Sequence, residues 1–364
     1  MNQRLEKLQA WMKENEIEVS FLTSSENVFY LSGYFTNPHE RLLGLAVFQD
    51  AEPFLVCPGM EVHDAKRSGW EHEIIGFSDI VNPWELVHSA IGKRINNVSK
   101  VAIEKEHMNV ERYEQLITLF PKAVLVSAEE KMRTLRMIKD AKELKIIEEA
   151  CVLADYAVEY GVSEIKAGKT ELDVLNAVEY ALKQKGVTEM SFATMVLTGA
   201  NAASPHGTPG GTKIQKGDLV LFDLGVVVDR YCSDITRTVA YGDINDKQKE
   251  IYDAVLKSQL AAIEASKPGM TAAEVDLAAR RVIADAGYGE YFPHRLGHGL
   301  GISVHEYPSM TETNQLIIEE GMVYTIEPGI YVPEVAGVRI EDDVFVTADG
   351  LKVLTKYPKE LQIV

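Results

Sequence analysis

KGDLVLFD (216–223) and EGMVYTIE (320–327) are the two stretches of this sequence that decide its fold. Each has a glycine near its start, continues as an apolar run typical of a buried β-strand, and ends on a carboxylate. The terminal acids, Asp223 and Glu327, lie 104 positions apart. This repetition predicts a duplicated half-domain whose acidic side chains face one another across a pseudo-twofold axis. Such an arrangement can assemble a site for two metal ions.

The likeness between the two halves extends in both directions. KAGKTELDV (166–174) is echoed by KPGMTAAEV (267–275), and a helical pattern follows each. A loop that contains histidine precedes each of the two strands. A second strand with another carboxylate follows each, in CSDITRT (232–238) and VRIEDDV (338–344). The series predicts two helix–helix–hairpin units that form one curved sheet covered by helices, which is an α+β domain with an internal repeat.

The N-terminal part of the chain has a different pattern. Short apolar runs such as VSFLT and PFLVC alternate there with four helix-like stretches, at 3–15, 61–68, 83–92 and 110–120. This alternation is typical of an α/β domain with a mixed sheet. A highly charged segment around 128–141 then leads into a long helical pattern. We therefore expect two domains, 1–130 and 131–364.

The composition narrows the class of protein. A chain of 364 residues with 46% hydrophobic and 25% charged residues can fill two cores. The formal net charge of −18 disfavours binding to nucleic acid or to anionic membrane surfaces. The three cysteines lack CxxC spacing, and no apolar run approaches the roughly 20 residues needed to cross a bilayer. We expect a cytoplasmic protein with reduced thiols.

The first hairpin carries two candidate metal ligands. A tight turn at 229–230 predicts that Val228 pairs with Tyr231. In that register Asp223 and Asp234 share one face as diagonal neighbours, about 7–8 Å apart at the backbone. Both acids lie within apolar strands, where an unpaired charge is costly to bury. A cation is therefore expected beside them.

The second half of the repeat completes the candidate set, which is four carboxylates and one imidazole: Asp223, Asp234, Glu327, Glu341 and His298. Taken singly, each fits a turn, a cap or a solvated acidic face, but their repeat-related positions favour a common site. Oxygen ligands with one nitrogen favour Mn²⁺, Co²⁺ or Zn²⁺. Four negative charges match two divalent ions, which can activate a bridging water.

Three further histidines lie in or beside the loops that lead to the ligand strands: His206, His294 and His305. They are candidates for binding a substrate carbonyl or carboxylate, or for stabilising an oxyanion. The alternative is an ordinary loop histidine satisfied by a hydrogen bond, and for His294 the two interpretations stay equal.

These residues resemble a known family, the Xaa-Pro peptidases prolidase and aminopeptidase P of the pita-bread metallopeptidases. The motifs that carry the resemblance are SPHG (204–207), DLG (223–225), SDITRT (233–238), GHGLG with VHEYP (297–308), EPGIYVP (327–333) and VRIEDD (338–343). They span the whole second domain in order. The first domain is similar through SSENVFYLSGYF (24–35), as in the creatinase N-terminal domain.

The resemblance implies a role for each candidate ligand. Asp223 is implied to chelate one metal ion, whereas Asp234 and Glu341 bridge both. His298 and Glu327 complete the other ion's ligands. A bridging hydroxide is then implied to attack the scissile carbonyl, with Glu327 passing a proton to the leaving nitrogen.

The resemblance also implies residues that contact the substrate. His206, His294 and His305 match the family's substrate-binding and oxyanion-stabilising histidines. Arg339 matches its arginine that supports the site beside Glu341, and Tyr331 is a candidate for lining the leaving-group pocket. A homodimer is implied as well.

The implied reaction is hydrolysis of the bond before proline in dipeptides or short peptides, with Mn²⁺ favoured among the metals. A dipeptidase is slightly preferred, and an aminopeptidase acting on longer peptides is the alternative. Two other readings stay open: a scaffold of the same fold that only binds proteins, and metal-free chemistry of the creatinase type. Both lose ligands that this chain retains.

Overall fold

A computed structural model describes residues 3–364, and the chain divides into two units, one ending at Arg136 and the other starting at Met137. Helix α6 (Glu129–Met137) leads from the first unit to the division.

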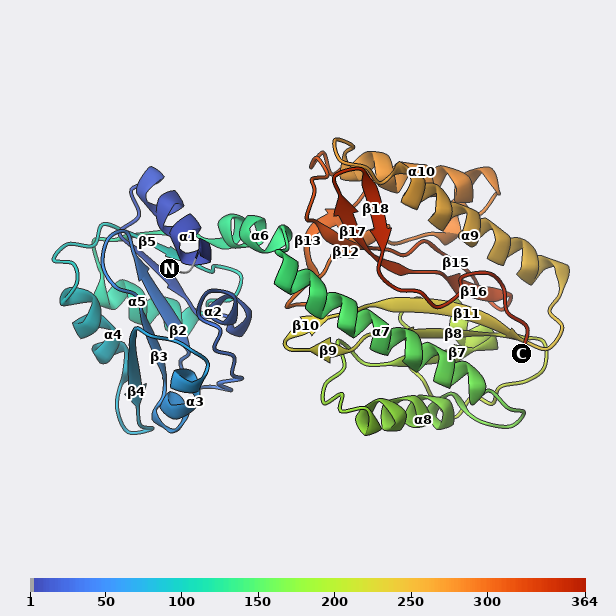
Figure 1. The fold of residues 1–364 in the computed structure, drawn as a ribbon, viewed down its shortest axis with the longest axis horizontal. Coiled ribbons are helices and arrows are strands. Elements are labelled where there is room, and N and C mark those ends of the chain that lie inside the picture. Colours follow the sequence, from blue (N-terminus) through green and yellow to red (C-terminus); the bar gives the residue numbers. More distant parts are fainter. Residues whose placement is uncertain (1–2) are drawn as a thin grey trace. The chain divides into compact units, whose positions relative to one another are not determined.

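The first unit contains a six-stranded sheet in the order β4-β3-β2-β1-β5-β6 (Figure 1). Its elements are α1 (Gln3–Glu14), β1 (Val19–Leu22), α2 (Ser25–Ser32), β2 (Gly44–Phe48), β3 (Phe54–Pro58), α3 (Val62–Arg67), β4 (Glu73–Phe77), α4 (Pro83–Gly92), β5 (Lys100–Ile103), α5 (Val110–Leu119) and β6 (Val124–Ser127). Strand β1 pairs antiparallel with β2 and parallel with β5. The sheet is therefore mixed, which confirms the α/β prediction.

The four helix-like stretches of this unit form α1, α3, α4 and α5. Helix α2 was not predicted as a helix. Its sequence, SENVFYLS, is short and mostly buried, so it lacks a clear amphipathic period. The local signal is its cap, since the Ser24 side chain accepts a hydrogen bond from the Asn27 backbone and Gly33 ends the helix at φ 76°.

The second unit contains two similar halves. The first half has α7 (Ala141–Ser163), α8 (Glu171–Gln184), β7 (Met195–Thr198), β8 (Asp218–Leu224), β9 (Val227–Val228), β10 (Tyr231–Cys232) and β11 (Ile235–Tyr241). The second half has α9 (Asp246–Ala265), α10 (Ala272–Asp285), β12 (Gly297–Gly299), β13 (Glu306–Met310), β14 (Val323–Ile326), β15 (Gly329–Val332), β16 (Ala336–Arg339), β17 (Asp342–Thr347) and β18 (Gly350–Val353). Two helix pairs, α7 with α8 and α9 with α10, flank these strands (Figure 1).

The repeat is visible in local backbone geometry. Thr170 is the N-cap of α8 and Thr271 is the N-cap of α10, and each forms a capping box with the acid three residues later. Each threonine also forms an isolated antiparallel bridge, Thr170 to Lys213 before β8 and Thr271 to Ile317 before β14. Each half has its own apolar core, one around Phe222 and the other around residues of α9, α10, β14 and β17. The internal repeat is thus confirmed.

The strands do not run on as one continuous ladder. The structure has a three-stranded sheet β11-β8-β7, a five-stranded sheet β13-β12-β14-β17-β18, and two short ribbons. Residues 339–341 pass beside β11 instead of pairing with it strand by strand. We call this line between the two halves, formed by residues 236–238 and 339–341, the seam. The backbone of the seam is irregular at Glu341, which lies between β16 and β17 and belongs to neither strand.

The predicted register of the first hairpin is confirmed. Val228 pairs with Tyr231 across a turn in which Asp229 and Arg230 have φ values of 44° and 73°. Both central residues of a tight hairpin turn of this type need positive φ.

The free edge of β11 is covered near the C-terminus of the described chain. Ile363 bridges Ala240 in parallel, and the Ala240 backbone donates to the Gln362 carbonyl at 2.8 Å. Val364 accepts a further hydrogen bond from Gly242 at 2.9 Å.

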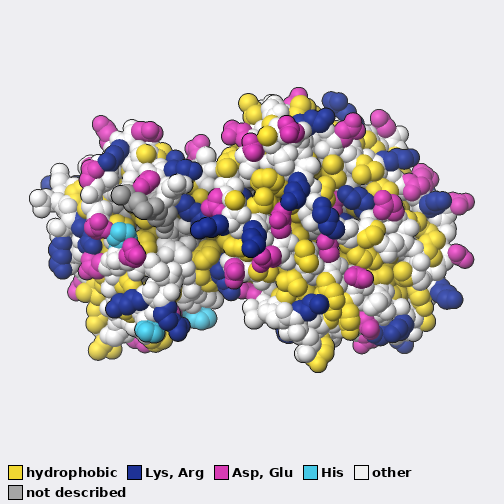
Figure 2. Space-filling model, viewed as in Figure 1, with side chains coloured by type: hydrophobic (Ala, Val, Ile, Leu, Met, Phe, Trp, Pro, Cys, Tyr) yellow, Lys and Arg dark blue, Asp and Glu magenta, His cyan; other side chains and the backbone are white. Residues whose placement is uncertain are grey.

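The surface carries both signs of charge. Figure 2 shows acidic and basic side chains interspersed over the face drawn. Among residues 3–364, the helices are too short or too polar to cross a membrane.

Candidate metal centre

Strand ends and strand-flanking segments from both halves bring the candidate ligands together. Asp223 lies in β8 opposite Thr236, and Asp234 immediately precedes β11. From the second half, Glu327 follows β14 directly, Glu341 lies between β16 and β17, and His298 is the central residue of β12. All five side chains line one cavity of about 350 Å³.

Glycines on both sides of His298 allow β12 to approach its neighbours closely. A Cβ at Gly297 would lie 1.9 Å from the Thr325 carbonyl oxygen, and one at Gly299 would lie 2.3 Å from the Tyr307 carbonyl oxygen. No side chain fits at these distances, which explains the Gly-His-Gly pattern. The imidazole is thereby held between two strands with 3% of the residue exposed.

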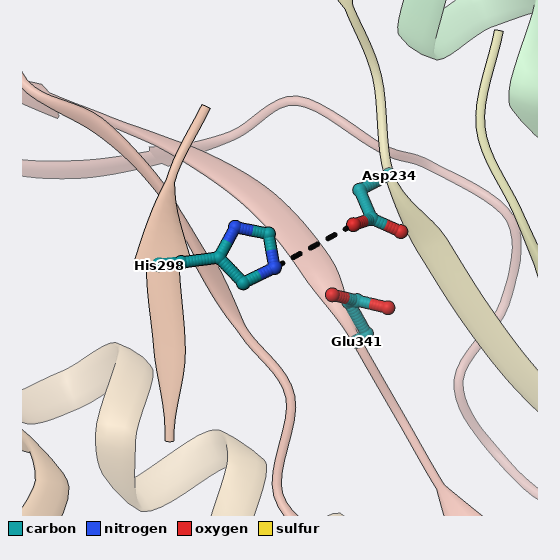
Figure 3. Close-up of side chains that lie close together, drawn as sticks. All are labelled: Asp234, His298 and Glu341. Atoms are coloured by element: carbon teal, nitrogen blue, oxygen red, sulfur yellow. Dashed lines mark ion pairs between the residues drawn. The ribbon is translucent and has the colours of Figure 1, made fainter. Parts of the chain in front are cut away.

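Three of the ligands are especially close. One donor atom from each of Asp234, His298 and Glu341 lies within 4.8 Å of the others (Figure 3). His298 Nε2 lies 3.7 Å from Asp234 Oδ2 and 3.4 Å from Glu327 Oε1. These distances leave space for a cation between the donor atoms.

The electrostatics of the cavity show a shortage of positive charge. Burial, together with repulsion from Glu341, Asp223 and neighbouring carboxylates, raises the pKa of Asp234 well above its ordinary value. The pKa of Glu341 is raised well above its ordinary value for the same reasons, and burial raises the pKa of Glu327 to about 7. Asp234 Oδ1 is buried and has no hydrogen-bond partner among the described residues.

His298 is in the state that a metal ligand needs. Burial lowers the pKa of its imidazole to about 3, assisted by the nearby charges of His305 and Arg295. The ring is therefore neutral at pH 7. A neutral imidazole, several buried carboxylates and an unpartnered carboxylate oxygen are the donor set that divalent cations bind.

Arg339 lines the cavity and contacts residues from both halves of the unit. Its guanidinium contacts Asp223, donates from Nη1 to the Tyr331 hydroxyl at 2.6 Å and donates from Nε to Thr236 Oγ1 at 3.0 Å. Thr236 Oγ1 in turn donates to Glu341 Oε2 at 2.5 Å. Arg339 thus reaches Glu341 through this threonine.

The three additional histidines all line the same cavity. The His305 ring lies 4.1 Å from the His298 ring, centroid to centroid, and His206 is at an exposed position. His294 Nε2 lies 3.0 Å from the Tyr331 hydroxyl, and burial lowers the pKa of His294 to about 4. Tyr331 is not among the residues that line the cavity; its hydroxyl connects His294 to Arg339.

Two residues at the site have no role in the sequence-based prediction. Arg295 lines the cavity and donates to Ser309 Oγ at 3.2 Å. Asp343 is fully buried, and its Oδ2 accepts hydrogen bonds from the Asp234 backbone at 2.8 Å and from the Cys151 thiol at 3.3 Å. The acidic run IEDD is a signal for Asp343, but which acid faces which neighbour follows only from the fold.

Comparisons with known proteins agree with this geometry. Residues 145–348 match the model of metallopeptidase family M24, and residues 4–138 match the creatinase/prolidase N-terminal domain. YkvY of Bacillus subtilis (strain 168), whose name proposes a dipeptidase, is 56% identical over 99% of each chain. The Xaa-Pro dipeptidase of Lactobacillus helveticus is 46% identical, over 99% of this chain and 98% of its own.

Solved structures are similar over nearly the whole length. The prolidase from Pyrococcus horikoshii OT3 has a TM-score of 0.92 and 38% identity, covering 99% of this chain and 100% of its own. The X-Pro aminopeptidase from Thermotoga maritima MSB8 has a TM-score of 0.87 and 28% identity, covering 96% and 98%. With the family model matching more than half of its residues, the chain belongs to metallopeptidase family M24 and carries a creatinase/prolidase N-terminal domain.

Proposed function

We propose that this metallopeptidase hydrolyses the bond before proline in Xaa-Pro dipeptides, using two divalent metal ions. The observation that carries the proposal is the buried cluster of Asp234, His298 and Glu341, with Asp223 and Glu327 on the same cavity. Asp223, Asp234, Glu327, Glu341 and His298 are the residues that would hold the ions, and the charge of four carboxylates would match two divalent cations. Relatives named Xaa-Pro dipeptidase and prolidase support the substrate.

The chain's own side chains supply binding and proton transfer. When bound, two divalent ions polarise a carbonyl and lower the pKa of water. Glu327 would accept the proton released by the attacking water and deliver it to the proline nitrogen, which lacks a hydrogen of its own. His206, His294 and His305 would bind the substrate and stabilise developing negative charge, because they line the cavity around the ligands. Arg339 would hold Asp223 in place through their contact.

Cavity size is compatible with a dipeptide substrate. The volume of about 350 Å³ lies near the lower end of the range for small-molecule pockets, about 300–1,000 Å³. The dipeptidase from Lactobacillus helveticus and the prolidase from Pyrococcus horikoshii are also more similar in sequence to this chain than the X-Pro aminopeptidase is. The alternative, an aminopeptidase acting on longer peptides, needs space for residues beyond the proline.

Removal of the metal is expected to abolish the reaction. Dialysis against a chelator should lower Xaa-Pro hydrolysis by more than about 100-fold, and Mn²⁺ should restore it, because the bound ions would activate the attacking water and polarise the scissile carbonyl. Co²⁺ and Zn²⁺ are the alternatives to compare. The same additions should raise the unfolding temperature, since a ligand of the native state stabilises it. Full activity after chelation would instead indicate metal-free chemistry of the creatinase type.

Substrate length distinguishes a dipeptidase from an aminopeptidase. We expect kcat/KM for an Xaa-Pro dipeptide to exceed that for the matching Xaa-Pro-Yaa tripeptide by more than tenfold, because discrimination is differential binding of the transition state. Steady-state rates with both substrates, at one metal concentration, measure the ratio. A ratio below one would assign the chain to the aminopeptidases.

We further propose a cytoplasmic homodimer. The resemblance to the family supports the dimer, and sedimentation velocity measures it directly. All three cysteines are buried and free, which is usual for a reducing compartment.

A further inference from the structure

The seam between the two halves depends on few backbone hydrogen bonds. Beside β11, the Glu341 backbone donates to the Thr236 carbonyl at 3.0 Å. Farther along, the link between Thr238 and Arg339 uses the threonine hydroxyl, which donates to the Arg339 carbonyl at 3.0 Å. A regular ladder would fix the chain by repeated backbone pairs. Side chains must therefore fix the position of Glu341.

One buried arginine crosses the seam at this point. The side chain of Arg237 is 1% exposed. Its Nη1 donates to the Thr236 carbonyl at 3.0 Å and also to the Glu341 carbonyl. Its Nη2 donates to Asp342 Oδ1 and to the Tyr357 carbonyl, both at 2.7 Å. The guanidinium thus joins both sides of the seam and the segment that follows β18.

The carboxylate of Asp342, which pairs with Arg237, accepts hydrogen bonds from several other side chains. Asp342 is fully buried, and its Oδ1 also accepts from Thr355 Oγ1 at 2.8 Å. Its Oδ2 accepts from Gln259 Nε2 at 2.5 Å and from the Lys359 ammonium. Each carboxylate oxygen therefore has at least two donors, so Asp342 is a fixed anchor.

Stability alone does not explain the buried ion pair between Arg237 and Asp342. A buried ion pair often stabilises a protein no more than apolar residues of the same volume, because both charges lose their hydration. The planar fork of an arginine, however, sets direction as well as distance. Here the Arg237 guanidinium donates hydrogen bonds to the Glu341 carbonyl and to the carboxylate of the next residue, Asp342.

We propose that Arg237, anchored on Asp342, is a positioning residue that holds the Glu341 backbone so that its carboxylate faces Asp234 across the cavity (Figure 3). The proposal rests on the proposed function, because it takes Glu341 as a metal ligand. Arg237 does not line the cavity, and it acts on the metal only through Glu341.

The test is metal affinity in the Arg237→Lys variant. Lysine keeps the positive charge but cannot donate to the Glu341 carbonyl and Asp342 in the fixed geometry of the fork. Calorimetric titration of the folded, metal-free variant with Mn²⁺ should give a dissociation constant at least tenfold higher than that of the parent. Far-UV circular dichroism should be unchanged.

A matched control separates positioning from general loosening. The Tyr252 hydroxyl donates to the Lys359 carbonyl at 2.8 Å, so Tyr252→Phe loosens the same C-terminal segment without touching the seam. This variant should lose thermal stability and bind Mn²⁺ like the parent. If Arg237→Lys also binds like the parent, Arg237 is structural only and the proposal is overturned.

A second variant, Asp342→Asn, tests the proposal if Arg237→Lys does not fold. Asp342→Asn keeps the guanidinium but weakens its anchor, so we expect a smaller fall in Mn²⁺ affinity than in Arg237→Lys. Parent-like affinity in the folded variant would overturn the proposal.

Mn²⁺ binding by the parent protein distinguishes failure of the proposed function from failure of this inference. If the parent itself fails to bind Mn²⁺, both the proposed function and this inference fall, whereas a parent that binds leaves the function intact whatever the variants do.

Discussion

Asp234→Asn should abolish metal-dependent hydrolysis while leaving the fold intact. The amide has nearly the same shape, but it removes the negative charge proposed to bridge two metal ions. Loss of residues that only support metal ligands costs about 10–100-fold, so loss of this ligand should lower kcat/KM by more than about 100-fold. The metal-free variant should be at least as stable as the parent, because burial and neighbouring carboxylates disfavour the charge of Asp234.

The matched control for this experiment lies in the adjoining hairpin turn. Asp229→Asn removes one carboxylate at an exposed position, and asparagine tolerates the φ of 44° there. Its Mn²⁺-dependent turnover of an Xaa-Pro dipeptide should equal that of the parent. Parent-like turnover in Asp234→Asn as well would remove Asp234 from the mechanism.

Gly297→Ala should destabilise the second unit more than an ordinary core substitution does. The added Cβ would lie 1.9 Å from the Thr325 carbonyl oxygen, which is backbone and cannot rotate away. Overpacking costs typically about 1–3 kcal/mol, and we expect a loss at or above the upper end of that range. Because β12 must shift, His298 should move with it and metal affinity should fall. Urea unfolding of the metal-free protein measures the stability.

Gly211→Ala is the corresponding control. A Cβ at Gly211 meets no heavy atom within 4 Å, and its φ is not in the left-handed region. This variant should unfold at the parent's urea midpoint. A parent-like midpoint for Gly297→Ala would show that β12 can move aside without cost and that the close packing at Gly297 is not needed for stability.

Local rules explain why much of the fold could be predicted from the sequence. The pairing of Val228 with Tyr231 depends only on a tight turn and strand alternation, both of which lie within a few residues. The internal repeat could be recognised because its motifs recur in the same order. Helix α2 could not be predicted by periodicity, because a short and mostly buried helix lacks the polar face that a helical pattern needs.

The supporting contacts of the site could not be predicted, because they join residues about a hundred positions apart. Arg339 contacts Asp223, and Thr236 donates to Glu341. Asp343 holds the backbone of Asp234. Each depends on how the two halves meet at the seam, where the regular ladder is interrupted. The identities of the five ligands and the domain boundary stay predictions until metal binding and limited proteolysis test them.

The covered edge of β11 has a consequence for solubility. Near the start of the strand Thr236 accepts the Glu341 backbone, and near its end Ala240 and Gly242 pair with the last residues of the chain. An exposed strand edge is a template on which another molecule can add a strand and begin to aggregate. Shortening the chain by even three residues would uncover part of this template. We therefore expect such a truncated protein to self-associate more readily than the parent.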